Sequence, residues 1–250
     1  MAALVFMIGA VFGSFYLVLS TRLPKKEDIV KSRSRCDYCG KSLKWYNLIP
    51  IFSYIFQGGK CIYCHKKIDI LNFIIEVITG LLFLICYLIY GLSYGFFISL
   101  IISSLVIIIF ISDIKYMIIL DSPLIVSVVL IFILKLYYFD LNELLLSINS
   151  GILLVLVMFL VRFIGNTLFK KDSLGGGDIK FAFLIGLIVK FQLGLIVLIL
   201  STFLALPYAV AVLHFKKNSE FPYGPFLAGA LLIVFLFIDK FTNFILYLFN

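Results

Sequence analysis

The segment Gly175-Gly176-Gly177-Asp178-Ile179-Lys180 leads directly into an apolar stretch, Phe181 to Val189. An ionisable residue at the mouth of a membrane helix is costly, and by default it indicates a functional site with a partner. The three glycines carry no side chains, so another chain can approach the backbone closely here. The best candidate partner is Asp113, which ends another apolar stretch and, like Asp178, is followed by Ile-Lys. We therefore interpret the rest of the chain as a scaffold for these two carboxylates.

The composition indicates an all-α polytopic membrane protein. Of the 250 residues, 63% are hydrophobic and 14% are charged, and the mean hydropathy is +1.17. Apolar stretches of about 20 residues recur, which excludes a soluble domain and implies a lipid bilayer as the surroundings. The formal net charge is +8, with eleven of the 21 Lys and Arg between Arg22 and Lys67. In a membrane protein such a cluster reports topology, so we expect no nucleic-acid partner.

The apolar pattern predicts about eight transmembrane helices. The first, Ala2 to Leu19, has no positive charge before it, so we expect a retained span with its N-terminus outside. Gly9 and Gly13 within it form a small-xxx-small pair suited to close helix packing. The segment near Asp178 is short for a crossing, so seven spans plus a half-buried helix is the alternative. The remaining predicted segments cover residues 72–90, 96–112, 122–139, 147–165, 179–190, 192–213 and 226–248.

The loop charges predict which ends of these segments face the cytoplasm. Cytoplasmic loops carry an excess of Lys and Arg, which places the basic insert, residues 23–71, on that side. Both Asp113 and Asp178 then lie at the cytoplasmic ends of their helices. We expect three parts: a first helix (1–22), a cytoplasmic insert (23–71) and a transmembrane core (72–250). The other loops on the cytoplasmic side carry Lys115, Lys170, Lys171, Lys180, Lys216 and Lys217, whereas the opposite loops carry only Lys190.

The insert contains two CxxC pairs, Cys36/Cys39 and Cys61/Cys64. Each lies beside glycines that favour a tight turn, so four thiolates can converge on one Zn²⁺ ion. A reducing cytoplasm favours a metal site over disulfides. A four-cysteine site leaves no open coordination position, so the predicted zinc is structural. The alternatives are redox-active thiols or an empty site, and the neighbouring His65 is not needed as a ligand.

Two aspartates in one low-dielectric site suit the hydrolysis of a peptide bond. Because both carboxyls cannot easily ionise together, they share a proton, and one acts as base on a water while the other acts as acid. One alternative is that each aspartate caps a helix terminus, which fits Asp178 better than Asp113. Another is a small proton-coupled transporter, but that class expects charges nearer the middle of the spans and often inverted repeats.

The chain resembles the type IV prepilin peptidases, membrane aspartyl proteases with a GxGD motif. Gly175 to Asp178 matches that motif, and Asp113 with Asp121 eight residues later matches the other aspartate motif. The remaining matches are Gly13-Ser14-Phe15, Arg22-Leu23-Pro24, Asn47 to Pro50, Ser53-Tyr54, Gly59-Lys60-Cys61 and Phe221-Pro222-Tyr223-Gly224-Pro225-Phe226. They follow one another in order from residue 13 to about 226.

The resemblance implies that Asp113 and Asp178 are the catalytic pair. Supporting positions would be Gly175, Gly176, Gly177, Lys115, Asp121 and Glu76. The implied substrates are prepilins and pseudopilins, cut after the glycine that ends a basic leader, at the cytoplasmic face of a bacterial inner membrane. Many members also methylate the new N-terminus with S-adenosylmethionine, an activity associated with the CxxC domain. Glu76 would then bind the nascent α-amino group, or else form a structural ion pair.

The sequence departs from the family pattern mainly in its first half. Leu17, Leu71 and Phe73 replace the usual Asn, Arg and Pro, and Leu120 replaces a proline before Asp121. None of these positions is one of the two aspartates. A leader peptidase without methyltransferase activity is therefore the main alternative.

Overall fold

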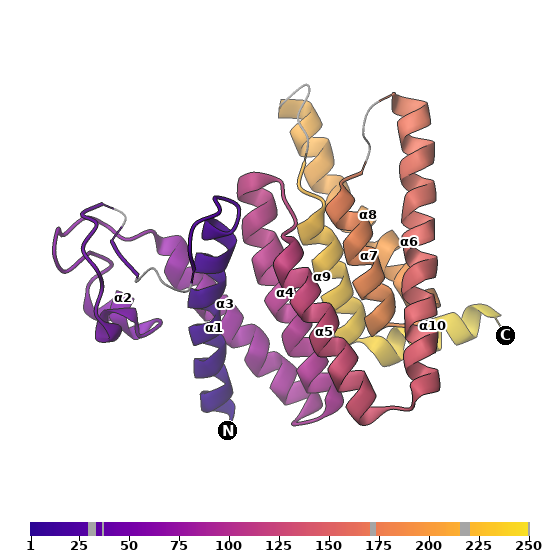
Figure 1. The fold of residues 1–250 in the computed structure, drawn as a ribbon, viewed down its shortest axis with the longest axis horizontal. Helices are drawn as coiled ribbons and strands as arrows, with labels where there is room; N and C mark the ends of the chain where they lie inside the picture. Colours follow the sequence, from indigo (N-terminus) through magenta and orange to yellow (C-terminus); the bar gives the residue numbers. More distant parts are fainter. Residues whose placement is uncertain (30–33, 37, 171–173, 216–220, 250) are drawn as a thin grey trace. The chain divides into compact units, whose positions relative to one another are not determined.

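The computed structural model describes residues 1–29, 34–36, 38–170, 174–215 and 221–249. Within these ranges the regular structure is helical, and the only β-type pairings are two isolated bridges, Arg35 with Ser42 and Lys60 with Lys67 (Figure 1). The helices are α1 Ala2–Arg22, η1 Trp45–Leu48, α2 Phe52–Phe56, α3 Ile70–Tyr90, α4 Tyr94–Tyr116, α5 Asp121–Tyr138, α6 Leu141–Phe169, α7 Gly176–Ile188, α8 Phe191–Phe215, α9 Gly224–Leu236 and α10 Ile238–Phe249.

The expected all-helical membrane fold is confirmed, and each predicted apolar segment forms a helix. Six of the described helices are long and apolar enough to span a bilayer. α7 has 13 residues, so it is about 20 Å long against a hydrocarbon core of about 30 Å. The last predicted segment, 226–248, is broken into α9 and α10, which are bent by 83° and count together as at most a seventh span. The break comes just before Asp239 and Lys240, two charges that hydrocarbon accommodates poorly.

The described residues form two compact units, which divide between Phe96 and Phe97. In the first unit α1 packs against α3 through small residues. A Cβ on Gly9 would lie 2.9 Å from the Cα of Gly80, and one on Gly13 would lie 2.8 Å from Oγ1 of Thr79. The predicted close packing at Gly9 and Gly13 is therefore confirmed. The first unit contains both α1 and α3, so its boundary does not coincide with the boundaries of the three predicted parts. The division of the chain into those three parts remains a prediction.

In the second unit the short helix α7 lies among four other helices, of which α9 is as short and the others are longer. It contacts α5, α6, α8 and α9 (Figure 1). Its side chains from Phe181 to Leu187 are almost all buried, which explains why its sequence is apolar on every face. α6 and α7 cross at Gly151 and Gly186, where an added Cβ on Gly186 would lie only 2.4 Å from the Cα of Gly151. The unit thus holds the aspartate at the start of α7 on its most buried helix.

Three of the lysines used in the topology prediction are not among the residues that the structure describes. Lys171, Lys216 and Lys217 lie outside the described ranges. The predicted membrane orientation therefore rests on the sequence.

Candidate active site

Asp113 lies in the last turns of α4, with its side chain only 6% exposed. Its Oδ2 accepts a hydrogen bond from the backbone N–H of Gly224 at 3.0 Å. Gly224 is the first residue of α9, and the N-terminus of a helix offers free N–H groups and a partial positive charge. The start of α9 therefore stabilises negative charge on Asp113.

Asp178 lies in the first turn of α7, with its side chain 8% exposed. The backbone N–H of Gly175 donates to its carboxylate, and the charge of Asp113 acts on it directly. Its Oδ1 is buried and has no hydrogen-bond partner among the described residues. Two buried carboxyls that interact cannot both ionise easily, so this arrangement favours one proton shared by the pair.

Both aspartates line one cavity of about 970 Å³ within the second unit. The glycines Gly175 to Gly177 and the side chain of Tyr223 also line it. A mainly apolar cavity with a few convergent polar groups is the usual form of a binding site. Its apolar walls come from α6 and α8 and include Val157, Met158, Val161, Leu195, Leu198 and Ile199.

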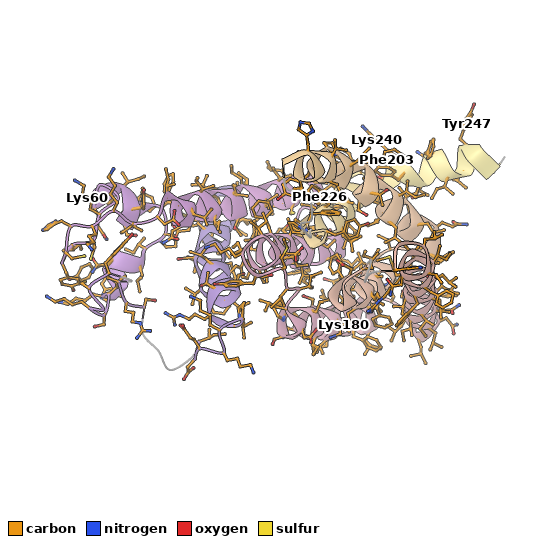
Figure 2. The ribbon with its side chains drawn as sticks, turned by 90° about the horizontal axis from the view of Figure 1, so that it is seen from above. Lys60, Lys180, Phe203, Phe226, Lys240 and Tyr247 are labelled. Atoms are coloured by element: carbon orange, nitrogen blue, oxygen red, sulfur yellow. The ribbon has the colours of Figure 1, made fainter. Side chains whose placement is uncertain are left out.

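An ion pair lines the more open part of this cavity. Nζ of Lys180, in α7, donates to Oδ1 of Asp121, the first residue of α5, at 2.7 Å (Lys180 is labelled in Figure 2). The two side chains are 60% and 57% exposed, so solvent weakens their attraction. The other supporting lysine suggested by the sequence, Lys115, is exposed in the last turn of α4 and does not line the cavity.

The three glycines before Asp178 differ in how tightly they are packed. A Cβ on Gly177 would lie 2.7 Å from Cβ of Ile119, and one on Gly175 would lie 3.0 Å from Oδ2 of Asp178. A Cβ on Gly176 would meet nothing within 4 Å. An added Cβ would therefore clash at the third position, be tight at the first and meet nothing at the middle one, which agrees with the pattern G-x-G-D.

Tyr223 lines the cavity, and sequence analysis had predicted no role for it. Its hydroxyl shares a hydrogen bond with that of Ser201 in α8. Tyr223 lines the same cavity as both aspartates; burial raises its pKa, and the negative charge of Asp178 raises it further. The signal that could have found it is its position in Phe221 to Phe226, the aromatic and proline-rich stretch just before α9.

Glu76 belongs to the first unit, where it lies in α3 with its side chain 9% exposed. Its Oε2 accepts a hydrogen bond from the backbone N–H of Ile51 at 2.7 Å, and Ser14 also bonds to it. Ile51 has a φ of 65°, which is rare for a β-branched residue. Glu76 thus ties the insert to α3, and its proposed contact with a substrate amine stays a prediction.

The insert brings the four predicted cysteines together. The sulfur atoms of Cys36, Cys39, Cys61 and Cys64 all lie within 4.8 Å of one another. The distance from Sγ of Cys36 to Sγ of Cys64 is 3.8 Å. A tetrahedral zinc site with Zn–S bonds near 2.3 Å has edges of about 3.8 Å, so the donors fit that ion. Backbone N–H groups, that of Cys64 first, lower the pKa of Cys61 to about 7. The backbone N–H of Lys66 lowers the pKa of Cys64, but burial and the other three cysteines together raise it to about 11, so the spacing of the four donors is what indicates a metal site.

Two equivalent turns build this cluster. In the first, the N–H of Cys36 donates to the carbonyl of Lys41, and the N–H of Gly40 donates back to Cys36. In the second, Cys61 and Lys66 pair in the same way, and His65 takes the place of Gly40. Gly40 and His65 both have positive φ, at 68° and 55°. His65 therefore occupies a turn position and is not one of the four residues of the cluster.

Comparisons with known proteins agree with this geometry. Residues 7–90 match the family model described as the Bacterial Peptidase A24 N-terminal domain, and residues 100–210 match the Type IV leader peptidase family. A prepilin leader peptidase/N-methyltransferase of Vibrio cholerae is 31% identical over 92% of this chain and 94% of its own length. The chain belongs to the type IV leader peptidase family.

Other members of the family align over comparable lengths. A protein of the same name from Bacillus subtilis is 29% identical over 98% of this chain and 97% of its own length. One from Neisseria gonorrhoeae is 28% identical over 83% of this chain and 72% of its own length. No solved structure matches the chain. The leader peptidase model covers both aspartates but ends at residue 210, so Tyr223 and Gly224 lie beyond it.

Proposed function

We propose that this chain cleaves the leader peptides of type IV prepilins and related pseudopilins after a glycine, and N-methylates the new N-terminus. The observation that carries the peptidase half is the cavity that holds the buried carboxyls of Asp113 and Asp178. The printed names of the relatives, prepilin leader peptidase/N-methyltransferase, support both halves.

Each carboxyl accepts one backbone N–H bond, from Gly224 or from Gly175, but among the described residues only Asp178 has a buried oxygen without a partner, which supports different roles for the two. The N–H of Gly224 favours the charged form of Asp113, so this residue is the general base that takes a proton from water. Asp178, with its unpartnered Oδ1, carries the shared proton and donates it to the oxygen of the scissile carbonyl. The water oxygen bonds to the carbonyl carbon. When the C–N bond breaks, the leaving amine takes the proton held by Asp113, and one hydroxyl of the tetrahedral intermediate returns a proton to Asp178 as the C=O bond re-forms.

The cavity suits a substrate with a polar leader followed by an apolar helix. Its walls from α6 and α8 are apolar and match the apolar helix of the substrate. Asp121 and Lys180 are exposed to solvent, so a basic leader that lies beside them would stay in water. The excess of Lys and Arg in the insert and in the loops near both aspartates favours the cytoplasmic face of a bacterial inner membrane. Gly175 to Gly177 leave room for an extended backbone at the cut site.

The insert would hold a structural Zn²⁺ ion through Cys36, Cys39, Cys61 and Cys64. An insert this small has little apolar core, so metal binding supplies a large part of its folding free energy. S-adenosylmethionine would be the methyl donor, because N-methylation of an amine needs an electrophilic methyl group.

Mass spectrometry of a coexpressed prepilin tests the function. Wild-type enzyme should remove the leader and add one methyl group, and both Asp113→Asn and Asp178→Asn should leave the precursor intact. Asp140→Asn is the matched control, since this aspartate is exposed and lies outside the cavity. Cleavage that survives both substitutions would refute the aspartyl mechanism. A cleaved but unmethylated product would leave a leader peptidase alone.

A further inference from the structure

The cavity that holds the two aspartates of the proposed mechanism is also lined by a third carboxylate, that of Asp121. The mechanism gives Asp121 no role, since Asp113 and Asp178 supply the base and the acid. The only positive charge among the described residues of the lining is that of Lys180. Because the buried pair shares one proton, the lining keeps a net negative charge, although the whole chain carries a formal net charge of +8. A cationic segment of a substrate is therefore attracted to this cavity more than to the rest of the chain.

Asp121 is far more accessible than the other two carboxyls. The side chains of Asp113 and Asp178 are 6% and 8% exposed, and that of Asp121 is 57% exposed. A lysine or arginine of a substrate that paired with the buried carboxyls would lose its hydration, which costs free energy. The same cation beside Asp121 would stay partly in water. The charged part of a substrate therefore fits Asp121, and the scissile peptide bond fits the buried pair.

The carboxylate of Asp121 has room for a further cation. Its Oδ1 accepts a hydrogen bond from Nζ of Lys180 at 2.7 Å, and no hydrogen bond from any residue that the structure describes reaches Oδ2. A carboxylate can accept about four hydrogen bonds. Asp121 is the first residue of α5, and the N-terminus of a helix stabilises a negative charge. Asp121 therefore offers a fixed acceptor with an open position in the more exposed part of the cavity.

Lys180 is a partner that a substrate cation can replace. Its side chain is 60% exposed, and exposed ion pairs of this kind are weak. Lysine carries its charge on a flexible four-carbon stem, so the ammonium group can move away while the backbone of α7 stays in place. A lysine of the substrate would exchange for it at little cost, and an arginine could bond to both oxygens of the carboxylate. Lys180 thus holds the position of a substrate cation in the free enzyme.

We propose that Asp121 selects substrates with a basic leader: its carboxylate pairs with a Lys or Arg of the leader, and Lys180 is the internal cation that this residue displaces. The proposal rests on the peptidase half of the proposed function. Asp121 is then a specificity-determining residue, and Asp113 and Asp178 keep their roles in bond cleavage. The ion pair forms on binding and persists through the reaction, so it acts on KM rather than on kcat.

Steady-state cleavage of a purified prepilin by the full-length enzyme in detergent is the first test. Asp121→Asn removes the charge that attracts the leader and should raise KM by about 2- to 5-fold, as expected for one exposed ion pair. Lys180→Met removes the competing cation and should lower KM by a similar factor. A pair that only holds α5 against α7 would instead weaken cleavage in both variants. Asp140→Asn, at an exposed aspartate outside the cavity, should leave KM unchanged.

A change of the leader's own charge is the second test. Each Lys and Arg of the leader is replaced in turn by Gln, and kcat/KM is measured with wild type and with Asp121→Asn. At the leader position that pairs with Asp121, the loss caused by Gln should be about 2- to 5-fold larger with wild type than with the variant. Asp121→Lys should cleave a leader with Glu at that position better than the original leader, whereas Asp140→Lys should show no such reversal. These differences should shrink as salt rises.

The outcomes separate this proposal from the proposed function. If wild type cleaves prepilin but the substitutions in the leader and at Asp121 act independently at every leader position, Asp121 does not select the leader and the proposed function stands. A rise in KM in Lys180→Met as large as that in Asp121→Asn leads to the same conclusion, because the pair is then structural. If wild type cleaves no prepilin, the peptidase half fails and this proposal fails with it.

Discussion

The backbone N–H of Gly224 donates a 3.0 Å hydrogen bond to Oδ2 of Asp113, although the two residues are 111 positions apart in the chain. This bond joins the first turn of α9 to the last turns of α4. Gly224 is also packed so closely that an added Cβ would lie 2.9 Å from the same carboxylate oxygen and 2.9 Å from Cγ2 of Ile109. The position of one aspartate thus depends on the absence of a side chain at Gly224.

Gly224→Ala should therefore inactivate the peptidase without unfolding it. The new methyl group must displace Asp113, and a shift of about 1 Å in a reacting group can lower kcat/KM by about 100-fold. Cleavage of a purified prepilin measures the effect. Gly229→Ala is the matched control in α9, because a Cβ there meets nothing within 4 Å. Equal activity of the two variants would show that Gly224 does not position Asp113.

Gly177→Ala and Gly176→Ala should change stability in opposite directions. The first forces a Cβ to within 2.7 Å of Ile119 and should lower the free energy of unfolding by about 1–3 kcal/mol. The second adds a methyl group in open space within a helix and should raise it by up to about 1 kcal/mol. Thermal unfolding in detergent compares them. A loss of stability in both variants would contradict the steric account of the GxGD motif.

Gly186→Ala should loosen the packing of α7 against α6. The added Cβ would meet backbone atoms of Gly151 at 2.4 Å, and backbone cannot move aside as a flexible side chain can. We expect a loss of at least about 1–3 kcal/mol in the free energy of unfolding. Because α7 carries Asp178, cleavage should fall as well. Gly229→Ala serves as the control. If Gly186→Ala were as stable as wild type, α6 and α7 would be less closely packed than the structure shows.

Removal of one cysteine ligand should remove the metal. Purified wild-type protein should contain roughly one zinc ion per chain, and Cys61→Ser should contain almost none, because four thiolates complete the tetrahedron. The insert should then become more sensitive to limited proteolysis, since metal binding stabilises its fold. Elemental analysis measures the zinc. Cys86→Ala, at a buried cysteine of α3 outside the cluster, should keep it.

The Asp121–Lys180 pair should contribute little to stability. Both side chains are more than half exposed, and exposed ion pairs are worth about 0–1 kcal/mol. A double-mutant cycle with Asp121→Asn and Lys180→Met should give a coupling energy below about 1 kcal/mol that shrinks as salt rises. A larger coupling that resists salt would mean that the pair is shielded from solvent.

The helical membrane fold, the cysteine cluster and the pair of aspartates could all be predicted from the sequence alone. These features are local: apolar stretches of membrane length, paired CxxC turns and carboxylates beside apolar segments can each be read within a short window. The same local pattern predicted a single span over residues 226–248, because a count of apolar residues holds no information about the 83° bend after α9.

The groups that surround those residues could not be predicted from the sequence and are known from the fold. The hydrogen bond from Gly224 to Asp113, the contact of Gly177 with Ile119, the anchoring of Ile51 by Glu76 and the pairing of Lys180 with Asp121 each depend on segments that meet only after folding. Close packing and hydrogen-bond satisfaction are properties of the whole interior, so no local pattern encodes them. The sequence indicates which residues carry the chemistry. Packing between helices that are distant in the chain sets the position and the hydrogen-bond partners of each one.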